Sequence, residues 1–296
     1  MKVLVLFFLT AFLFSCASSK YKFRADLYRP TEPELKMCFI GDTGKDTSAQ
    51  AVVAEALESE KCNSVYFLGD IIYKRGIWGA SDPEFKKKFL DYYQRIPEKD
   101  HKPKLHLIMG NHDHRGSVKA WFELSKKFPF IYYPHYYYFQ NTSGYCVFAL
   151  DSEFYLQPDL FPLVPQQEKW LKDTLAREKS CKVTMALTHH PYKSSGRAHG
   201  NATNSVKQFH ETQVLGKFDL LLSGHDHILS FEGVSNGTSL FVSGTGGDPD
   251  KGQLPGFLTL EVEKLGESAP QIIFKSIMTD GQVRLKKFSF KPIDRN

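Results

Sequence analysis

The sequence lacks three features that would narrow its function. None of its five cysteines stands in Cys-x-x-Cys spacing, which argues against a thiolate zinc site. Its formal net charge is only +5, which is compatible with anionic substrates but gives no support to nucleic-acid binding. Its N-terminal apolar run, residues 3–14, is too short to cross a bilayer as a mature helix. The 296 residues are nevertheless 42% hydrophobic, enough to bury the core of one large domain or two small ones.

The first residues are typical of an export signal. Lys2 and the apolar run 3–14 match the charged and hydrophobic parts of a secretory signal peptide. The run ends in Leu13-Phe14-Ser15-Cys16, which resembles the bacterial lipobox. The resemblance implies cleavage before Cys16, a lipid on its sulfur and, because Ala17 follows, an outer-membrane location. The alternative is a plain signal peptide cut nearby, which would leave the protein in the periplasm or at the cell surface.

This interpretation predicts three parts. Residues 1–15 form the signal, 16–33 form the lipidated cysteine and a polar tether, and 34–292 form one folded domain. Membrane contact is expected only through the lipid anchor at Cys16, and the oligomeric state is left open.

Four cysteines fall inside the predicted domain, namely Cys38, Cys62, Cys146 and Cys181. An exported protein could pair them in any of three connectivities. Free thiols buried in strands are the alternative, and the residues themselves do not decide between the two.

Short apolar runs alternate with amphipathic stretches, which predicts an α/β fold. A strand over 37–40 ends at Asp42, a helix follows over 48–60, and a second strand over 64–68 ends at Asp70. This is a βαβ unit, whose parallel strands both end in an aspartate. Further strands are predicted at 105–109, 145–150, 182–187 and 218–222, with helices at 83–93 and 165–178. The chain beyond residue 231 alternates apolar segments with glycine-rich turns and predicts a β-rich closing layer.

Five segments that follow these strands carry the candidate chemistry. They are Gly41-Asp42-Thr43-Gly44, Gly69-Asp70-Ile71-Ile72-Tyr73, Gly110-Asn111-His112-Asp113, Thr188-His189-His190-Pro191 and Gly224-His225-Asp226-His227. Their carboxylate, amide, phenol and imidazole groups are suitable ligands for Zn, Fe or Mn, and α/β folds bring such groups together where parallel strands end. A single histidine is more often structural, but the recurring context favours a site for two metal ions, with Asp70 between them and in contact with both.

The same set of motifs resembles the purple acid phosphatase branch of the calcineurin-like metallophosphoesterases. Most of that superfamily has a histidine ligand where Gly44 stands, whereas this branch uses a tyrosine at the position of Tyr73. Both features occur here. His114 and the downstream His199-Gly200 are similar to the small mammalian type, the tartrate-resistant acid phosphatases. The likeness covers roughly residues 35 to 290 and implies a four-layer α/β sandwich, with two mixed sheets packed face to face and helices outside.

The resemblance also implies the ligand sets. Asp42, Asp70, Tyr73 and His227 would hold the first metal, and Asp70, Asn111, His189 and His225 the second. A tyrosine phenolate suits Fe3+, whose charge transfer would colour the protein purple or pink, and the second ion would be Fe2+, Zn2+ or Mn2+. His189, rather than His190, matches the family's His-x-Pro spacing.

The implied activity is hydrolysis of phosphate monoesters by in-line attack of a metal-activated hydroxide. His112 and His199 would donate to the leaving group, and Asp113 would orient His112. The predicted function is therefore an exported acid phosphatase whose partner is a phosphate ester substrate and not a nucleic acid. The alternatives are a phosphodiesterase or nucleotidase on the same metal pair, oxygen-radical chemistry at iron, and a non-catalytic surface-binding lipoprotein.

Overall fold

The computed structural model describes residues 33–98, 102–290 and 292–293. The predicted signal and the lipobox Cys16 lie outside the described residues. Within them, no helix combines the length and the apolar character needed to cross a bilayer.

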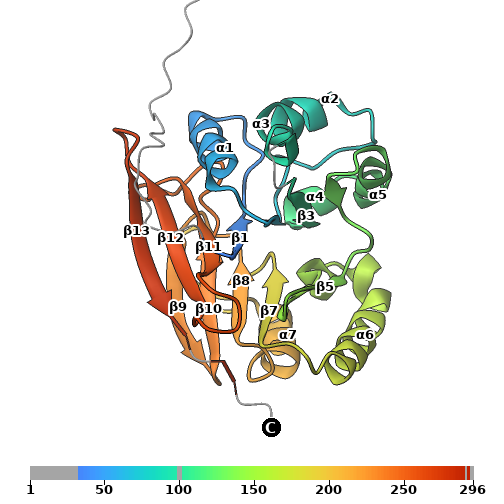
Figure 1. Ribbon diagram of the computed structural model, residues 1–296. Helices are drawn as coiled ribbons and strands as arrows, with labels where there is room; N and C mark the ends of the chain where they lie inside the picture. Colours follow the sequence, from blue (N-terminus) through green and yellow to red (C-terminus); the bar gives the residue numbers. More distant parts are fainter. Residues whose placement is uncertain (1–32, 99–101, 291, 294–296) are drawn as a thin grey trace, which may run out of the picture.

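Two mixed β-sheets form the centre of the molecule (Figure 1). The first sheet contains, in spatial order, β13 (Val283–Ser289), β12 (Gln271–Ile277), β11 (Gly256–Val262), β1 (Leu35–Ile40), β2 (Ser64–Leu68), β3 (Lys104–Ile108) and β4 (Ile131–Tyr132). The second contains β5 (Tyr138–Thr142), β6 (Tyr145–Ala149), β7 (Val183–Thr188), β8 (Leu220–Ser223), β10 (Thr238–Ser243) and β9 (Leu229–Ser235).

Parallel strands occupy the part of each sheet that carries the candidate motifs. Strands β1 to β4 run parallel to one another, as do β6, β7, β8 and β10, whereas β11 to β13, β5 and β9 add antiparallel neighbours. Parallel strands are covered on both faces, so they read as continuous apolar runs. Every residue of β2 is buried, for example. The carboxyl ends of β1, β2 and β3 therefore meet at one edge of the first sheet.

Helices cover the outer faces of the two sheets (Figure 1). They are α1 (Ser48–Glu60), α2 (Pro83–Phe85), α3 (Asp91–Tyr93), α4 (Asn111–His114) and α5 (Val118–Lys127) beside the first sheet, with α6 (Val164–Arg177) and α7 (Asn204–Phe209) beside the second. The helix expected over 83–93 is present, but a π-helical turn at Lys86–Leu90 separates α2 from α3. The predicted class, two mixed sheets flanked by helices, is confirmed.

Two apolar cores hold these layers together. The larger one joins side chains of both sheets with α1 and α5, including Phe39, Val53, Trp121 and Leu187, all fully buried. The smaller one packs α6 and α7 against the outer face of the second sheet. Burial on this scale fixes the strand ends relative to one another, because packed interiors deform little.

The cysteines are paired, which resolves the choice that the sequence leaves open. Cys38 on β1 is bonded to Cys62 just after α1, and Cys146 on β6 is bonded to Cys181 just before β7. Such bonds form and persist in oxidising environments, so they favour an extracellular or secreted protein.

Candidate dimetal site

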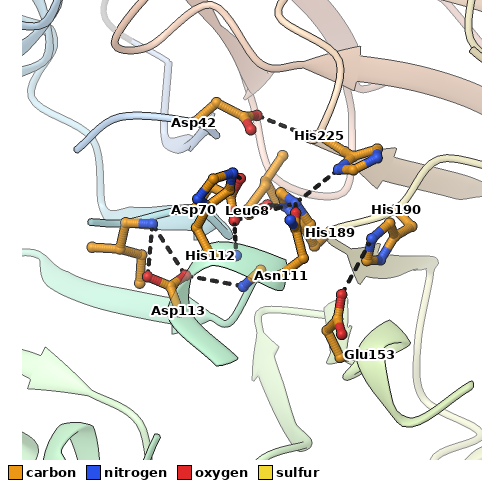
Figure 2. A network of polar contacts seen from close by, with 12 residues as sticks. Asp42, Leu68, Asp70, Asn111, His112, Asp113, Glu153, His189, His190 and His225 are labelled. Atoms are coloured by element: carbon orange, nitrogen blue, oxygen red, sulfur yellow. Dashed lines mark hydrogen bonds and ion pairs between the residues drawn. The ribbon is translucent and has the colours of Figure 1, made fainter. Parts of the chain in front are cut away.

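The predicted ligands lie where strands of both sheets end, and Figure 2 shows five of them, Asp42, Asp70, Asn111, His189 and His225. Asp42 follows β1, Asp70 and Tyr73 follow β2, Asn111 follows β3, His189 follows β7, and His225 and His227 follow β8. Asp42, Asp70 and His189 are buried and each offer one ligand atom within 4.8 Å of the others. The carboxyl ends of both sets of parallel strands thus contribute to a single site, as expected for an α/β fold.

Sharp turns aim several of these side chains inward. Asp42, Asp70 and His225 have φ angles of 58°, 52° and 73°, a left-handed conformation that is uncommon outside glycine. The turn at Asp42 is held by the neighbouring strand, since its N–H donates to the carbonyl of Gly69 at 3.0 Å. The N–H of His225 donates to Asp42 Oδ2 at 2.8 Å. Backbone strain of this kind clusters at functional sites and is held in place by the surrounding hydrogen bonds.

The loop that carries Tyr73 also explains Gly44. The N–H of Tyr73 donates to the carbonyl of Gly44 at 2.9 Å. A Cβ at Gly44 would lie 1.8 Å from the carbonyl oxygen of Ile71. No side chain fits there without moving the loop, so the position of the Tyr73 loop requires glycine at 44.

His189 presents one nitrogen to the centre of the site. Its Nδ1 lies 2.9 Å from the carbonyl of Leu68 and donates its proton to it, which leaves the lone pair on Nε2. That Nε2 lies 3.1 Å from Asn111 Oδ1, 3.2 Å from His225 Nδ1 and 3.4 Å from Asp70 Oδ1. Carboxylate and amide oxygens cannot donate a proton to it. A cluster of lone pairs in a buried place fits a bound cation.

Asp42, Tyr73 and His227 form a second cluster beside the first. Tyr73 Oη donates to Asp42 Oδ1 at 2.9 Å and lies 3.0 Å from His227 Nε2. Burial raises the pKa of Asp42 well above its usual value, and the nearby charge of Asp70 adds to this. Burial, with the charges of Asp42 and Asp70, also raises the pKa of Tyr73. Two carboxyl groups and a phenol packed this closely in a dry site fit a cation of high charge.

His225 and His227 are suited to coordination because a lowered pKa keeps their imidazoles neutral. Burial lowers the pKa of His225, and the neighbouring histidines lower it further. Burial also lowers the pKa of His227, with a contribution from Lys45. Neutral imidazole is the form that binds metal. The donor set as a whole therefore fits two metal ions that share Asp70.

His190 lies next to the ligand cluster but faces away from Asp70 (Figure 2). Its Nδ1 is 2.8 Å from Ser152 Oγ, and its Nε2 is 3.4 Å from Glu153 Oε1. Both ring nitrogens thus have partners from the segment after β6. His189 is the member of the pair that meets Asp70 and Asn111.

His112 lies above the shared carboxylate. Its Nδ1 is 2.5 Å from the carbonyl of Lys74, its Nε2 is 3.8 Å from Asp70 Oδ2, and its ring packs on Tyr73 with centroids 4.3 Å apart. Burial lowers its pKa, and the charge of Asp70 opposes that shift. His112 therefore presents Nε2 to the side of the site where Asp70 lies.

Asp113, which was expected to orient His112, contacts other groups in the structure. Its carboxylate accepts hydrogen bonds from the N–H groups of Ile71, Ile72 and Gly110, at 3.0–3.1 Å. No hydrogen bond joins it to the His112 ring in the part of the chain that the structure describes. Burial raises its pKa to about 7, with a contribution from the charge of Asp70. Asp113 is thus a positioning residue that ties the Asp70 loop to the start of α4.

The structure also brings His199 to the site, through a residue that sequence reasoning missed. The exposed ring of His199 packs on His225 with centroids 4.1 Å apart. Its N–H donates to Asp226 Oδ1 and that of Gly200 to Asp226 Oδ2, each at 3.0 Å. Asp226 is fully buried between two ligand histidines. In the sequence, the signal for Asp226 as the residue that holds the His199 loop was its place inside the Gly-His-Asp-His motif.

The chain is similar to known phosphoesterases. The sequence model of the calcineurin-like phosphoesterase family matches residues 35–229. Tartrate-resistant acid phosphatase type 5 of Sus scrofa is 29% identical over 252 residues, covering 75% of this chain and 73% of the relative. Purple acid phosphatase 7 of Arabidopsis thaliana is 25% identical over 282 residues, covering 84% and 82%.

A solved structure supports the fold. GAP50, the anchor in the inner membrane complex of Plasmodium, has a TM-score of 0.67 and 19% identity, covering 88% of this chain and 90% of its own. The family match shows that the chain belongs to the calcineurin-like phosphoesterase family, and the likeness in fold agrees with this.

Proposed function

We propose that this protein is an exported acid phosphatase that hydrolyses phosphate monoesters at a pair of metal ions. The observation that carries the proposal is the convergence of lone pairs on His189 Nε2 beside the buried cluster of Asp42 and Tyr73. The curated relatives named above are acid phosphatases. Every ligand that the family resemblance requires is present in this chain.

The metal assignment is part of the proposal. Asp42, Asp70, Tyr73 and His227 would hold Fe3+, and Asp70, Asn111, His189 and His225 would hold Fe2+, Zn2+ or Mn2+. When bound, the two ions supply neutralisation of phosphate charge and an activated water for in-line attack on phosphorus. The phenolate of Tyr73 would give the iron its visible absorption.

The chain's own residues have separate tasks. Because His112 Nδ1 donates to the carbonyl of Lys74, its Nε2 can donate to a leaving-group oxygen only when the ring is protonated, which acid pH favours. His199, on the loop that Asp226 holds, is the second candidate donor. Asp113 keeps Asp70 and Asn111 in register through backbone hydrogen bonds.

The export part of the proposal is supported by the disulfides and by the N-terminal residues. Cys16→Ser should release the protein from membranes if a lipid on that sulfur is its anchor. Continued membrane association of this variant would contradict the lipid on Cys16 and point to another anchor.

The experiment that tests the activity compares a chromogenic phosphate monoester with its diester analogue, at acid and neutral pH. It uses protein whose metal content has been measured, with metal-stripped and reconstituted samples as controls. Faster monoester cleavage at acid pH is expected. Diester preference would instead indicate a phosphodiesterase, and inactivity with two ions bound would leave an enzyme of narrow specificity or a binding protein. Peroxide-dependent activity that requires iron would point to radical chemistry.

A further inference from the structure

The cavity above the Tyr73 side of the site is lined by an excess of positive charge. Its volume is about 440 Å³, and Asp70, Tyr73 and His227 belong to its walls. The cationic side chains that line it are those of Lys45, Lys74, Lys88 and Arg115. Asp70 is the one carboxylate among the described lining residues. Such a cavity is large enough for a small ligand.

Two of these cations already have partners. Lys88 Nζ lies 2.5 Å from Glu84 Oε2 and also donates to the carbonyl of Tyr73. Lys45 Nζ lies 3.1 Å from Asp248 Oδ2 and sits 4.5 Å above the ring of Tyr73. These two lysines therefore support the Tyr73 loop.

Lys74 and Arg115 remain available. Both are exposed, and neither forms an ion pair with a carboxylate of the described residues. Arg115 is nevertheless held in place, since its Nη1 donates to the carbonyl of Lys74 at 3.4 Å. Two uncompensated cations thus stand beside His112, the candidate donor to the leaving group.

A neighbouring cavity is lined by fewer lysine and arginine side chains than the first. It has a volume of about 380 Å³, shares Arg115 and His199 with the first cavity, and reaches Asn111 and His225. Its other walls include the neutral side chains of Leu156, Pro191, Ala202 and Val206. Positive charge is therefore concentrated on one side of the reacting centre.

A single phosphate group does not require these cations, because two metal ions would already neutralise it. We propose that the preferred substrate carries a second phosphate group near the one that is hydrolysed, and that Lys74 and Arg115 bind it. Arginine suits phosphate through its fork of parallel donors, and lysine adds a point charge. This inference rests on the proposed phosphatase function.

The reaction itself is unchanged by the second group. The oxygen of water bonds to the terminal phosphorus, and the P–O bond to the rest of the substrate breaks with its electron pair on that oxygen. The oxygen left on the rest of the substrate takes a proton, and orthophosphate leaves. The second phosphate could belong to a phosphoanhydride or to a sugar bisphosphate, since both offer the same anionic group.

The first arm of the test measures kcat/KM for pyrophosphate, fructose 1,6-bisphosphate and fructose 6-phosphate, with p-nitrophenyl phosphate as reference. In the full-length protein, kcat/KM for pyrophosphate should exceed that for p-nitrophenyl phosphate, or kcat/KM for fructose 1,6-bisphosphate should exceed that for fructose 6-phosphate. Lys74→Ala should lower this ratio roughly tenfold, the size expected for a lost hydrogen bond to a charged group. Lys172→Ala, a charge removed from a different groove on α6, should leave the ratio as it is. Which of the first two substrates responds identifies the source of the second phosphate.

The second arm measures binding without turnover. Calorimetry compares methylenediphosphonate with methylphosphonate on metal-loaded protein, and metal content is checked afterwards because diphosphonates chelate. The diphosphonate should bind more tightly, and Lys74→Ala should remove most of that advantage. Arg115→Lys should retain more of it than Arg115→Ala, since the lysine keeps the charge.

The outcomes separate the two proposals. Two results would overturn this inference and leave the phosphatase function intact. One is monoester hydrolysis with no preference for a second phosphate. The other is an equal loss of kcat/KM in Lys74→Ala for substrates with one phosphate and with two. Diphosphonate binding through Lys74 and Arg115 without hydrolysis of any substrate would instead overturn the phosphatase function.

Discussion

The two sides of the site are held together in different ways. On the tyrosine side, defined by Asp42, Tyr73 and His227, the ligands hydrogen-bond mainly to one another. On the histidine side, defined by Asn111, His189 and His225, the protein positions the ligands from outside. The backbone carbonyl of Leu68 fixes the ring of His189, and a buried polar layer with His190, Ser152 and Glu153 lies behind it (Figure 2).

The two sides also differ in the protonation of the groups that would bind a metal ion. The raised pKa values of Asp42 and Tyr73 keep a proton between the phenol and the carboxylate, so a metal must displace it. The lowered pKa of His225 keeps its imidazole neutral and ready to bind. This agrees with the proposed assignment of the trivalent ion to the tyrosine side and the divalent ion to the histidine side.

The largest predicted effect comes from removing what the two sides share. Asp70→Asn should lower kcat/KM for a phosphate monoester by at least about 10³-fold, because the metal pair contributes several kcal/mol and each 1.4 kcal/mol is about tenfold. Elemental analysis should show less of both ions. Asp173→Asn on the exposed face of α6 is the control. An active variant carrying both ions would mean that Asp70 is not the bridge.

A matched pair of variants should separate the two sides. Tyr73→Phe should abolish the visible absorption and lower the iron content, while the histidine-side ion remains. Asn111→Ala should do the reverse and keep the colour. Activity in each should fall on the order of 10²-fold, less than for Asp70→Asn, since one ion stays. Absorption spectra and elemental analysis check both. An unchanged spectrum in Tyr73→Phe would remove Tyr73 from the iron site, and loss of both ions in both variants would show that the sides do not act separately.

A smaller effect is expected at the turn that joins the sides. The carboxylate of Asp226 accepts two backbone N–H groups of the His199 loop, and an amide can accept with only one of its two end atoms. Asp226→Asn should therefore lower kcat about tenfold while both metal ions are retained. If the variant lost metal and colour together, Asp226 would be holding the ligands His225 and His227 rather than the loop.

The sequence was sufficient for the fold class and for the segments that meet at the site. Alternating apolar and amphipathic runs predict parallel strands, and the polar residues after Leu68 or Ile108 lie where such strands end. The helix predicted over 48 to about 60 is present as α1. These inferences succeed because they depend on local periodicity and on one general rule about strand ends.

The remaining features depend on contacts between distant segments. Asp113 bonds to backbone groups about forty residues away, so its neighbour His112 was the wrong place to look for its partner. The pairing of Cys38 with Cys62 requires α1 to return the chain beside β1. The cations Lys74 and Arg115 belong to different loops and become a pair only when Arg115 reaches the carbonyl of Lys74. Spacing along the chain does not encode such distances.

The last predicted effect is on stability rather than activity, and it tests a buried ion pair on the histidine side. His114 ends α4, the helix that starts with Asn111, and its Nε2 lies 2.8 Å from Asp151 Oδ2, with both side chains buried. Burial lowers the pKa of His114, but the charge and hydrogen bond of Asp151 outweigh it, so the pKa lies above its usual value. The stabilisation is therefore complete below the unfolded pKa and is lost as pH rises through the folded pKa.

The measurement is the free energy of urea unfolding at about pH 5.5 and about pH 8.5, with metal content held constant. His114→Gln should cost about 3 kcal/mol in acid, as expected when a buried ion pair is broken, and less in alkali. His106→Gln is the matched control of opposite sign, because burial lowers the pKa of His106 to about 3 and its neutral ring opposes folding in acid. Its cost should shrink as pH falls. Equal pH slopes for the two variants would mean that His114 is not charged, and that the histidine side is held by packing rather than by a buried ion pair.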